Sequence, residues 1–120
     1  MRNAPMEQSE IDRSVVYVLS SILEYVPGSV VTRVVVQRPT GSILAIASDT
    51  GEGIGEKIYQ FESFVQVVDG EVEVKIGQKV HPLWKGQAIM VPAHYRHTFK
   101  SATRFKLIST IIKSGYEEVV

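Results

Sequence analysis

Two of the three histidines in this sequence lie close together, at His94 and His97 in the segment PAHYRHTF. An imidazole titrates near physiological pH, so it can ligate a metal, exchange a proton or hydrogen-bond a ligand. His97 begins a predicted strand on the same face as Phe99, and it either lines the core or contacts a ligand in a pocket. His94 lies in a predicted loop, where it either stays solvated or serves the same pocket. His81 precedes a proline and is assigned no role.

A lysine and a tyrosine are also spaced for joint chemistry. Lys57 and Tyr59 are two residues apart, so in a regular strand their side chains point to the same side. The ammonium and the phenol would then share one space. Two alternatives stay open: Lys57 pairs with a carboxylate of Glu52, Glu56 or Glu62, and Tyr59 is a core aromatic with a bonded hydroxyl.

Three other features predict structure instead of chemistry. The glycines of GEGIG, at residues 51–55, are not followed by a lysine-serine pair and a helix, so they indicate backbone turning and not a phosphate loop. Glu71 and Glu73 lie on the polar face of an alternating strand and indicate a solubilising edge, not an acid–base couple. Trp84 is interpreted as a packing or rim aromatic.

Composition narrows the classes of partner. The chain carries 13 basic and 13 acidic residues, so no net field attracts nucleic acid or an anionic membrane. It has no cysteine, which excludes disulfides and zinc–thiolate sites and is compatible with a reducing compartment. No apolar run approaches the roughly 20 residues that span a bilayer, and the first residues lack the order of a signal peptide. We therefore expect a cytoplasmic protein with no nucleic-acid or membrane partner.

The period of the apolar residues changes once along the chain. Residues 1–13 are polar and predict an arm that stays loose until it finds a surface. From residue 11 to residue 26 apolar residues recur at spacings of three and four, which predicts a short amphipathic helix that ends at Pro27-Gly28. After it the period is two, and turn residues, including Asp69-Gly70, separate the runs. The predicted strands are 30–37, 42–48, 61–68, 71–76, 79–83, 88–91, 97–101 and 105–112.

Short strands at this spacing, with no crossover helix, predict an all-β, antiparallel sandwich or barrel in a single domain. Val72, Val74 and Ile76 share one face of their strand and are expected to point inward. The strands 61–68 and 105–112 carry apolar residues on both faces. One barrel and one helix cannot easily cover all of that surface, which predicts a homodimer that uses the outer face of 61–68.

The spacing of several glycines, a proline and a histidine resembles the two sequence motifs of the cupins. Gly51 and Gly70 stand at the two ends of the first motif. Gly86, Pro92 and His97 stand at the spacing of the second motif. These positions agree with the strand pattern, which was read independently of them. The chain therefore resembles a small cupin of the largely uncharacterised kind.

This resemblance covers about residues 40–112, with the motifs at about 51–70 and 86–101. It implies a jelly-roll β-barrel, the double-stranded β-helix of RmlC-like proteins, with the short helix before it. The domain organisation that follows is an N-terminal arm, residues 1–13, and a single cupin domain, residues 14–120.

The same resemblance shows that most of the family's metal ligands are replaced. The two histidine positions of the first motif fall on Lys57 and Tyr59, and its glutamate position falls on Ser63. His97 keeps the ligand type of the second motif, whereas His94 replaces the motif's glycine. Because a divalent ion needs several converging lone pairs, this set implies no metal and no other cofactor. The residues implied for ligand binding are Lys57, Tyr59, Ser63, His94 and His97.

Three classes of function stay open. The first, and the one we favour, is a metal-independent cupin that binds a small molecule, a small anion, through Lys57, Tyr59 and His97. The second is a metal-independent acid–base enzyme of isomerase, epimerase or lyase type that uses the same three side chains, as some cupin-like sugar-nucleotide epimerases do with histidine and tyrosine. The third is a dimeric structural module without a ligand. An unconventional metal site of His94, His97 and nearby carboxylates also stays open.

Overall fold

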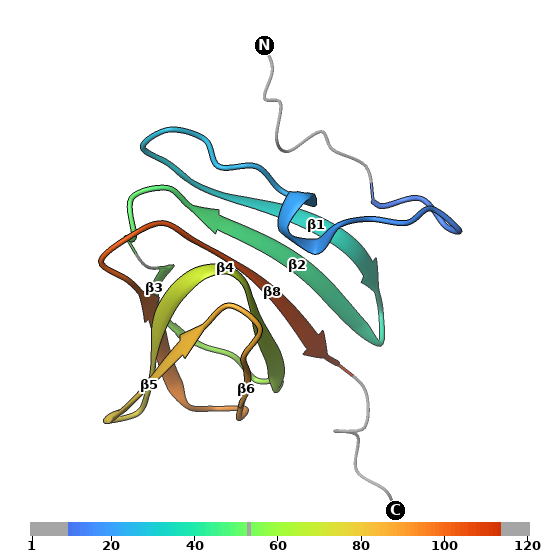
Figure 1. The fold of residues 1–120 in the computed structure, drawn as a ribbon. Helices are drawn as coiled ribbons and strands as arrows, with labels where there is room; N and C mark the ends of the chain where they lie inside the picture. The colour runs from blue at the N-terminus through green and yellow to red at the C-terminus, as the bar shows by residue number, and fades with distance from the viewer. Residues whose placement is uncertain (1–9, 53, 114–120) are drawn as a thin grey trace, which may run out of the picture.

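The computed structural model describes residues 10–52 and 54–113, which form an all-β fold (Figure 1). Within these residues no helix has the length and apolar character needed to cross a bilayer. A short 3-10 turn, η2 (Leu19–Ser21), precedes the strands. The strands are β1 (Val30–Arg38), β2 (Gly41–Ser48), β3 (Ile54–Ile58), β4 (Ser63–Ile76), β5 (Lys79–Trp84), β6 (Ala88–Val91), β7 (Arg96–Lys100) and β8 (Phe105–Ile112).

The strands form an antiparallel sheet that curls into a half-barrel. Their order is β1-β2-β8-β4-β7-β3, and β5 and β6 also pair with β4. The first half of β4 pairs with β6 and β8, and its second half pairs with β5 and β7. The strand therefore passes from one layer of the barrel to the other, as Figure 1 shows by its strong curvature. The predicted antiparallel jelly-roll barrel is confirmed.

The turn predicted at Asp69-Gly70 is a bend inside one long strand. Residues on both sides of it belong to β4, and the pairing with β8 shifts register between Val67 and Asp69. Gly70 has a φ of 73°, a backbone conformation that side chains disfavour, and a Cβ there would collide with the carbonyl oxygen of Arg104. The dipeptide thus makes a bulge that bends the chain instead of reversing it.

The helix predicted over residues 11–26 does not form. Apart from η2 the segment is irregular, with a turn at residues 13 and 14, where Ser14 adopts a φ of 64°. Of the apolar residues that carry the helical spacing, Ile22 and Leu23 are buried and the others are exposed. The segment is rich in valine and other residues of modest helix propensity. Packing of a few side chains onto the sheet therefore outweighs the spacing, and Figure 1 shows the segment lying along β1.

Two clusters of buried apolar residues lie on opposite faces of the curled sheet. On β8, Leu107 belongs to the inner cluster and its neighbour Ile108 belongs to the outer one. The inner cluster fills the barrel with Ile46, Val65, Val67, Val72, Val74, Leu83, Val91, Phe99, Phe105 and Leu107, and Ile76 packs against it. The outer cluster lies under the N-terminal segment and contains Ile22, Leu23, Val35, Ala45, Ala47 and Ile108. The inward direction predicted for the valines of β4 is confirmed.

A polar cluster fastens the N-terminal segment to the outer face. The Tyr25 hydroxyl donates a hydrogen bond to Asp69 Oδ2 at 2.5 Å, and Lys106 Nζ donates one to Ser20 O at 2.5 Å. The Tyr25 ring also lies under two cations, with the Arg104 guanidinium 3.8 Å and the Lys106 ammonium 4.6 Å from its centroid. Burial, together with the bond to Asp69, raises the pKa of Tyr25 far above its usual range. The phenol therefore remains a hydrogen-bond donor at physiological pH.

Candidate functional site

The pairing of β3 with β7 brings two of the predicted site residues together. Lys57 on β3 lies directly opposite His97 on β7 in antiparallel register. Side chains of directly opposed residues share a face of the sheet, so the ammonium and the imidazole lie on the same side. His97 is 2% exposed, whereas Lys57 is exposed. The pair thus extends from the barrel interior toward solvent.

Two aromatic rings pack against the His97 imidazole. The centroid of Tyr59 is 5.1 Å from that of His97 at an interplanar angle of 71°, and that of Phe99 is 5.4 Å away at 69°. Both contacts are edge-to-face, the geometry that aromatic pairs prefer. Tyr59 is half-buried and Phe99 is buried. The structure therefore brings Lys57, Tyr59 and His97 into one cluster with a fixed imidazole.

One nitrogen of His97 has no partner in the part of the chain that the structure describes. His97 Nδ1 lies 3.4 Å from the carbonyl oxygen of Tyr95. His97 Nε2 is buried and makes no hydrogen bond with any described residue. An unpaired buried polar atom costs about 1–3 kcal/mol, and native proteins rarely leave one. The interior therefore contains a polar group that a bound molecule can satisfy.

The surroundings of His97 favour the neutral imidazole. Burial lowers the pKa of His97, the hydrogen bond to the Tyr95 carbonyl raises it in part, and the nearby Lys57 cation lowers it again. A neutral imidazole offers one N–H donor and one lone pair. The cluster can therefore present a cation, a phenol and an imidazole lone pair to one ligand.

The two remaining predicted residues contribute differently. Ser63 is buried at the start of β4 and faces the barrel like Val65, but the ring cluster around His97 does not include it. His94 is exposed and adopts a φ of 68°, the left-handed conformation that suits the glycine of the second motif. Its backbone amide donates a hydrogen bond to the Tyr59 carbonyl at 2.7 Å. His94 thus anchors Tyr59 through the backbone.

The donor atoms gathered here do not fit a divalent metal. Among the described residues, no three side chains of His, Cys, Asp or Glu lie close enough to hold an ion. The cluster itself offers one imidazole, one phenol and the ammonium of Lys57, whose positive charge opposes a cation. The residues present therefore do not match the metal site that the resemblance to cupins would imply.

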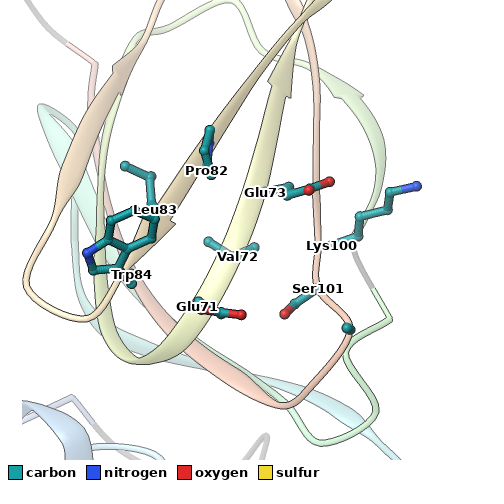
Figure 2. Close-up of a pocket in the computed structure, with 9 residues that line it drawn as sticks. Glu71, Val72, Glu73, Pro82, Leu83, Trp84, Lys100 and Ser101 are labelled. Atoms are coloured by element: carbon teal, nitrogen blue, oxygen red, sulfur yellow. The ribbon is translucent and has the colours of Figure 1, made fainter.

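A separate groove of about 490 Å³ lies on the outer face of β4 and β5, beside the end of β7. Figure 2 shows Glu73 and Lys100 projecting from neighbouring strands, with Trp84 on the far side of β4. Trp84 is 53% exposed. None of the predicted site residues lines this groove. Sequence reasoning missed it because cross-strand register, which pairs Glu73 with Pro82 and Lys100, brings these residues together.

Comparison with known proteins gives a family and a fold. Residues 49–111 match the Cupin domain family. A conserved protein of unknown function from Streptococcus pyogenes superposes with a TM-score of 0.82 at 24% identity, covering 98% of this chain and 100% of that one. A cupin superfamily protein from Desulfitobacterium hafniense superposes with a TM-score of 0.78 at 21% identity, covering 93% of this chain and 98% of that one. At these identities the two structures support the fold alone.

Curated relatives resemble only a part of the chain. Polyketide synthase CurC from Streptomyces cyaneus is 38% identical over 52 residues, which are 42% of this chain and 34% of that protein. The matched part thus spans about a third of the length of the curated relatives. This match reaches fewer residues than the family match does.

Proposed function

The chain belongs to the Cupin domain family, and from that premise we propose that its barrel binds a small anionic molecule without a metal ion. One observation carries the proposal: His97 Nε2 is buried and unpaired among the described residues, beside an ammonium instead of a metal ligand. An anion such as a carboxylate neutralises Lys57, and a polar group elsewhere on the same molecule can pair with His97 Nε2. Tyr59, which touches the imidazole, forms the third contact.

The test is a thermal-shift screen of small carboxylates and phosphorylated sugars against the unaltered chain and Lys57→Met. Methionine keeps much of the side-chain length and removes the charge. We expect binding of a hit to weaken by about 1.5–3 kcal/mol, the range for a hydrogen bond to a charged group. Lys100→Met is the matched control, since Lys100 is an exposed lysine at the end of β7, beyond the cluster.

Two outcomes of that screen contradict the proposal. If no anion stabilises the unaltered chain, the barrel is a structural module filled by its own side chains. If Lys57→Met and Lys100→Met weaken a hit equally, Lys57 serves as a salt-bridge partner and not as a ligand contact. Retained folding of both variants is checked by circular dichroism.

A metal-independent acid–base enzyme is the second candidate. The lowered pKa of His97 supports it, because a neutral imidazole can accept a proton from a substrate. The Tyr59 phenol, in contact with the ring, is the complementary acid. Proton exchange at the carbon next to the carboxylate of a bound hit, followed by NMR in D₂O, tests this activity. It should vanish in His97→Gln, and exchange that persists there contradicts the role.

We also propose that the barrel forms a homodimer through the part of its outer face that the N-terminal segment does not cover. Phe64 on β4 lies directly opposite Met90 on β6 and Thr110 on β8. Phe64 is 38% and Met90 45% exposed, so a second copy can bury them across a two-fold axis. Light scattering should report a dimer that Phe64→Glu dissociates. A monomer at micromolar concentration contradicts the proposal.

A further inference from the structure

The hydrogen-bond roles of the His97 nitrogens follow from what surrounds them. A carbonyl oxygen only accepts, so the tautomer in which the 3.4 Å contact of Nδ1 with Tyr95 O is a hydrogen bond carries its proton on Nδ1. A neutral imidazole carries a single N–H proton, which leaves Nε2 with a lone pair and no hydrogen. Nε2 is therefore an acceptor, and only a hydrogen-bond donor can satisfy it.

The lone pair of Nε2 is held in a fixed direction. The edge-to-face contacts with Tyr59 and Phe99 lie at 5.1 and 5.4 Å, so two aromatic rings restrict the imidazole. His97 is 2% exposed, and Nε2 itself is closed to solvent. A donor must therefore reach it by moving a side chain of the cluster. Phe99 is buried, whereas Tyr59 is only half-buried, so Tyr59 is the side chain that can yield.

The two polar ends of the cluster require different chemical groups on a ligand. Lys57, at the exposed end, can only donate hydrogen bonds and carries a positive charge, so it suits a carboxylate. Nε2, at the buried end, needs an O–H or N–H donor. A simple carboxylate offers acceptors alone and leaves Nε2 unpaired when it binds.

We infer that the ligand is a hydroxy acid, whose carboxylate contacts Lys57 and whose neighbouring hydroxyl donates a hydrogen bond to His97 Nε2. This inference rests on the proposed function, because it names the chemical class of the anion in the same cluster. Sites that hydrogen-bond a ligand hydroxyl discriminate strongly against the analogue that lacks it, because the site's own polar atom is then unpaired. Tyr59 swings away from the imidazole as the hydroxyl enters.

The binding test uses matched pairs of probes on the full chain: glycolate with acetate, lactate with propionate, and gluconate with hexanoate. Titrations followed by NMR should show the hydroxy acid of each pair binding about tenfold or more tightly. His97→Leu should abolish that preference, whereas Lys57→Met should weaken both members of a pair alike. Lys100→Met is the control and should change neither.

A second measurement does not depend on any variant. Long-range ¹H–¹⁵N NMR of the unaltered chain reports which imidazole nitrogen of His97 carries the proton, and we expect Nδ1. A proton on Nε2 overturns the inference. Equal binding within every pair also overturns it but leaves the proposed anion site standing. If none of the six carboxylates binds, this inference fails, whereas the proposed function fails only if the wider screen with phosphorylated sugars also finds no anion.

Discussion

Two buried nitrogen groups on opposite faces of this barrel differ in whether they have a hydrogen-bond partner. Lys106 on β8 is 6% exposed and lies under the N-terminal segment, where Ser20 O accepts its hydrogen bond and the Tyr25 ring lies 4.6 Å away. Glu24 lies 3.8 Å from the same ammonium. His97 on β7 is 2% exposed and keeps Nε2 unpaired among the described residues.

The difference separates a structural polar group from one available for binding. A buried cation with a satisfied hydrogen bond and an aromatic partner contributes to folding, and removing it leaves its partners unpaired. A buried nitrogen without a partner costs free energy, and the fold tolerates that cost where another molecule can offset it. The contrast predicts that substitutions at the two positions differ in the size of their effect on the free energy of unfolding.

The largest effect is expected from Lys106→Met. The substitution preserves the aliphatic stem but leaves the half-buried carbonyl of Ser20 without its donor. We expect the free energy of unfolding to fall by about 1.5–3 kcal/mol, the value of a hydrogen bond to a charged group. Urea denaturation followed by circular dichroism measures it. Lys100→Met, at an exposed site, should change it by less than about 0.5 kcal/mol. If Lys106→Met and Lys100→Met lost equal free energy of unfolding, the buried ammonium would contribute no more to stability than an exposed one.

A smaller decrease in the free energy of unfolding is expected from Tyr25→Phe, which keeps the ring beneath Arg104 and Lys106. The change deletes only the hydroxyl that donates to Asp69, and we expect a cost of about 1 kcal/mol. The double variant with Lys106→Met should lose less than the sum, because the two groups touch. Strict additivity in urea denaturation would show that they act independently.

His97→Leu should change the free energy of unfolding by less than about 1 kcal/mol in either direction. The loss of two edge-to-face contacts opposes the relief of an unpaired buried nitrogen, and the two are similar in size. Ligand binding should fall while stability is kept. A loss of stability as large as that of Lys106→Met would identify His97 as a structural core residue instead.

The smallest effect is the pH dependence that His97 contributes. Its pKa is lower in the folded chain than the value of about 6.5 for an unfolded histidine, so the unfolded state binds more protons. The contribution to stability is therefore complete above about pH 6.5 and is lost as the pH falls through the folded pKa. Between about pH 7 and pH 5 the melting temperature should fall more steeply for the unaltered chain than for His97→Leu. Parallel curves for the two proteins would contradict the lowered pKa.

The sequence was sufficient to predict the proximity of three site residues and the strands other than β3, although it divided β4 into two strands. The alternation in EVEVKI places Val72 and Val74 inside, and the motif spacing that placed Lys57 and Tyr59 near His97 agrees with the β3–β7 register. Alternation and turn spacing are local properties that a short window of sequence contains. The role of these residues in binding stays a prediction.

What the sequence could not predict depends on contacts between distant residues. Tyr25 meets Asp69 across 44 residues, and Lys106 meets Ser20 across 86. Those contacts hold an irregular N-terminal segment on the sheet, whereas apolar spacing alone predicted a helix there. Asp69-Gly70 is a common turn signal, yet the neighbouring Arg104 carbonyl and the pairing with β8 continue the strand through it. In each case tertiary packing outweighed a local preference.

The long strand β4 determines how this barrel can unfold. It pairs with β5, β6, β7 and β8, so neither layer can separate from the other without breaking hydrogen bonds to it. Partial unfolding that spares half of the barrel is therefore disfavoured, and the central amides of β4 should exchange with solvent only when the whole domain opens. By contrast, β3 pairs only with β7 among residues 10–52 and 54–113, so the strand that carries Lys57 can open by itself. The lysine thus belongs to a strand that can open locally, while its histidine partner belongs to β7, which pairs with β4.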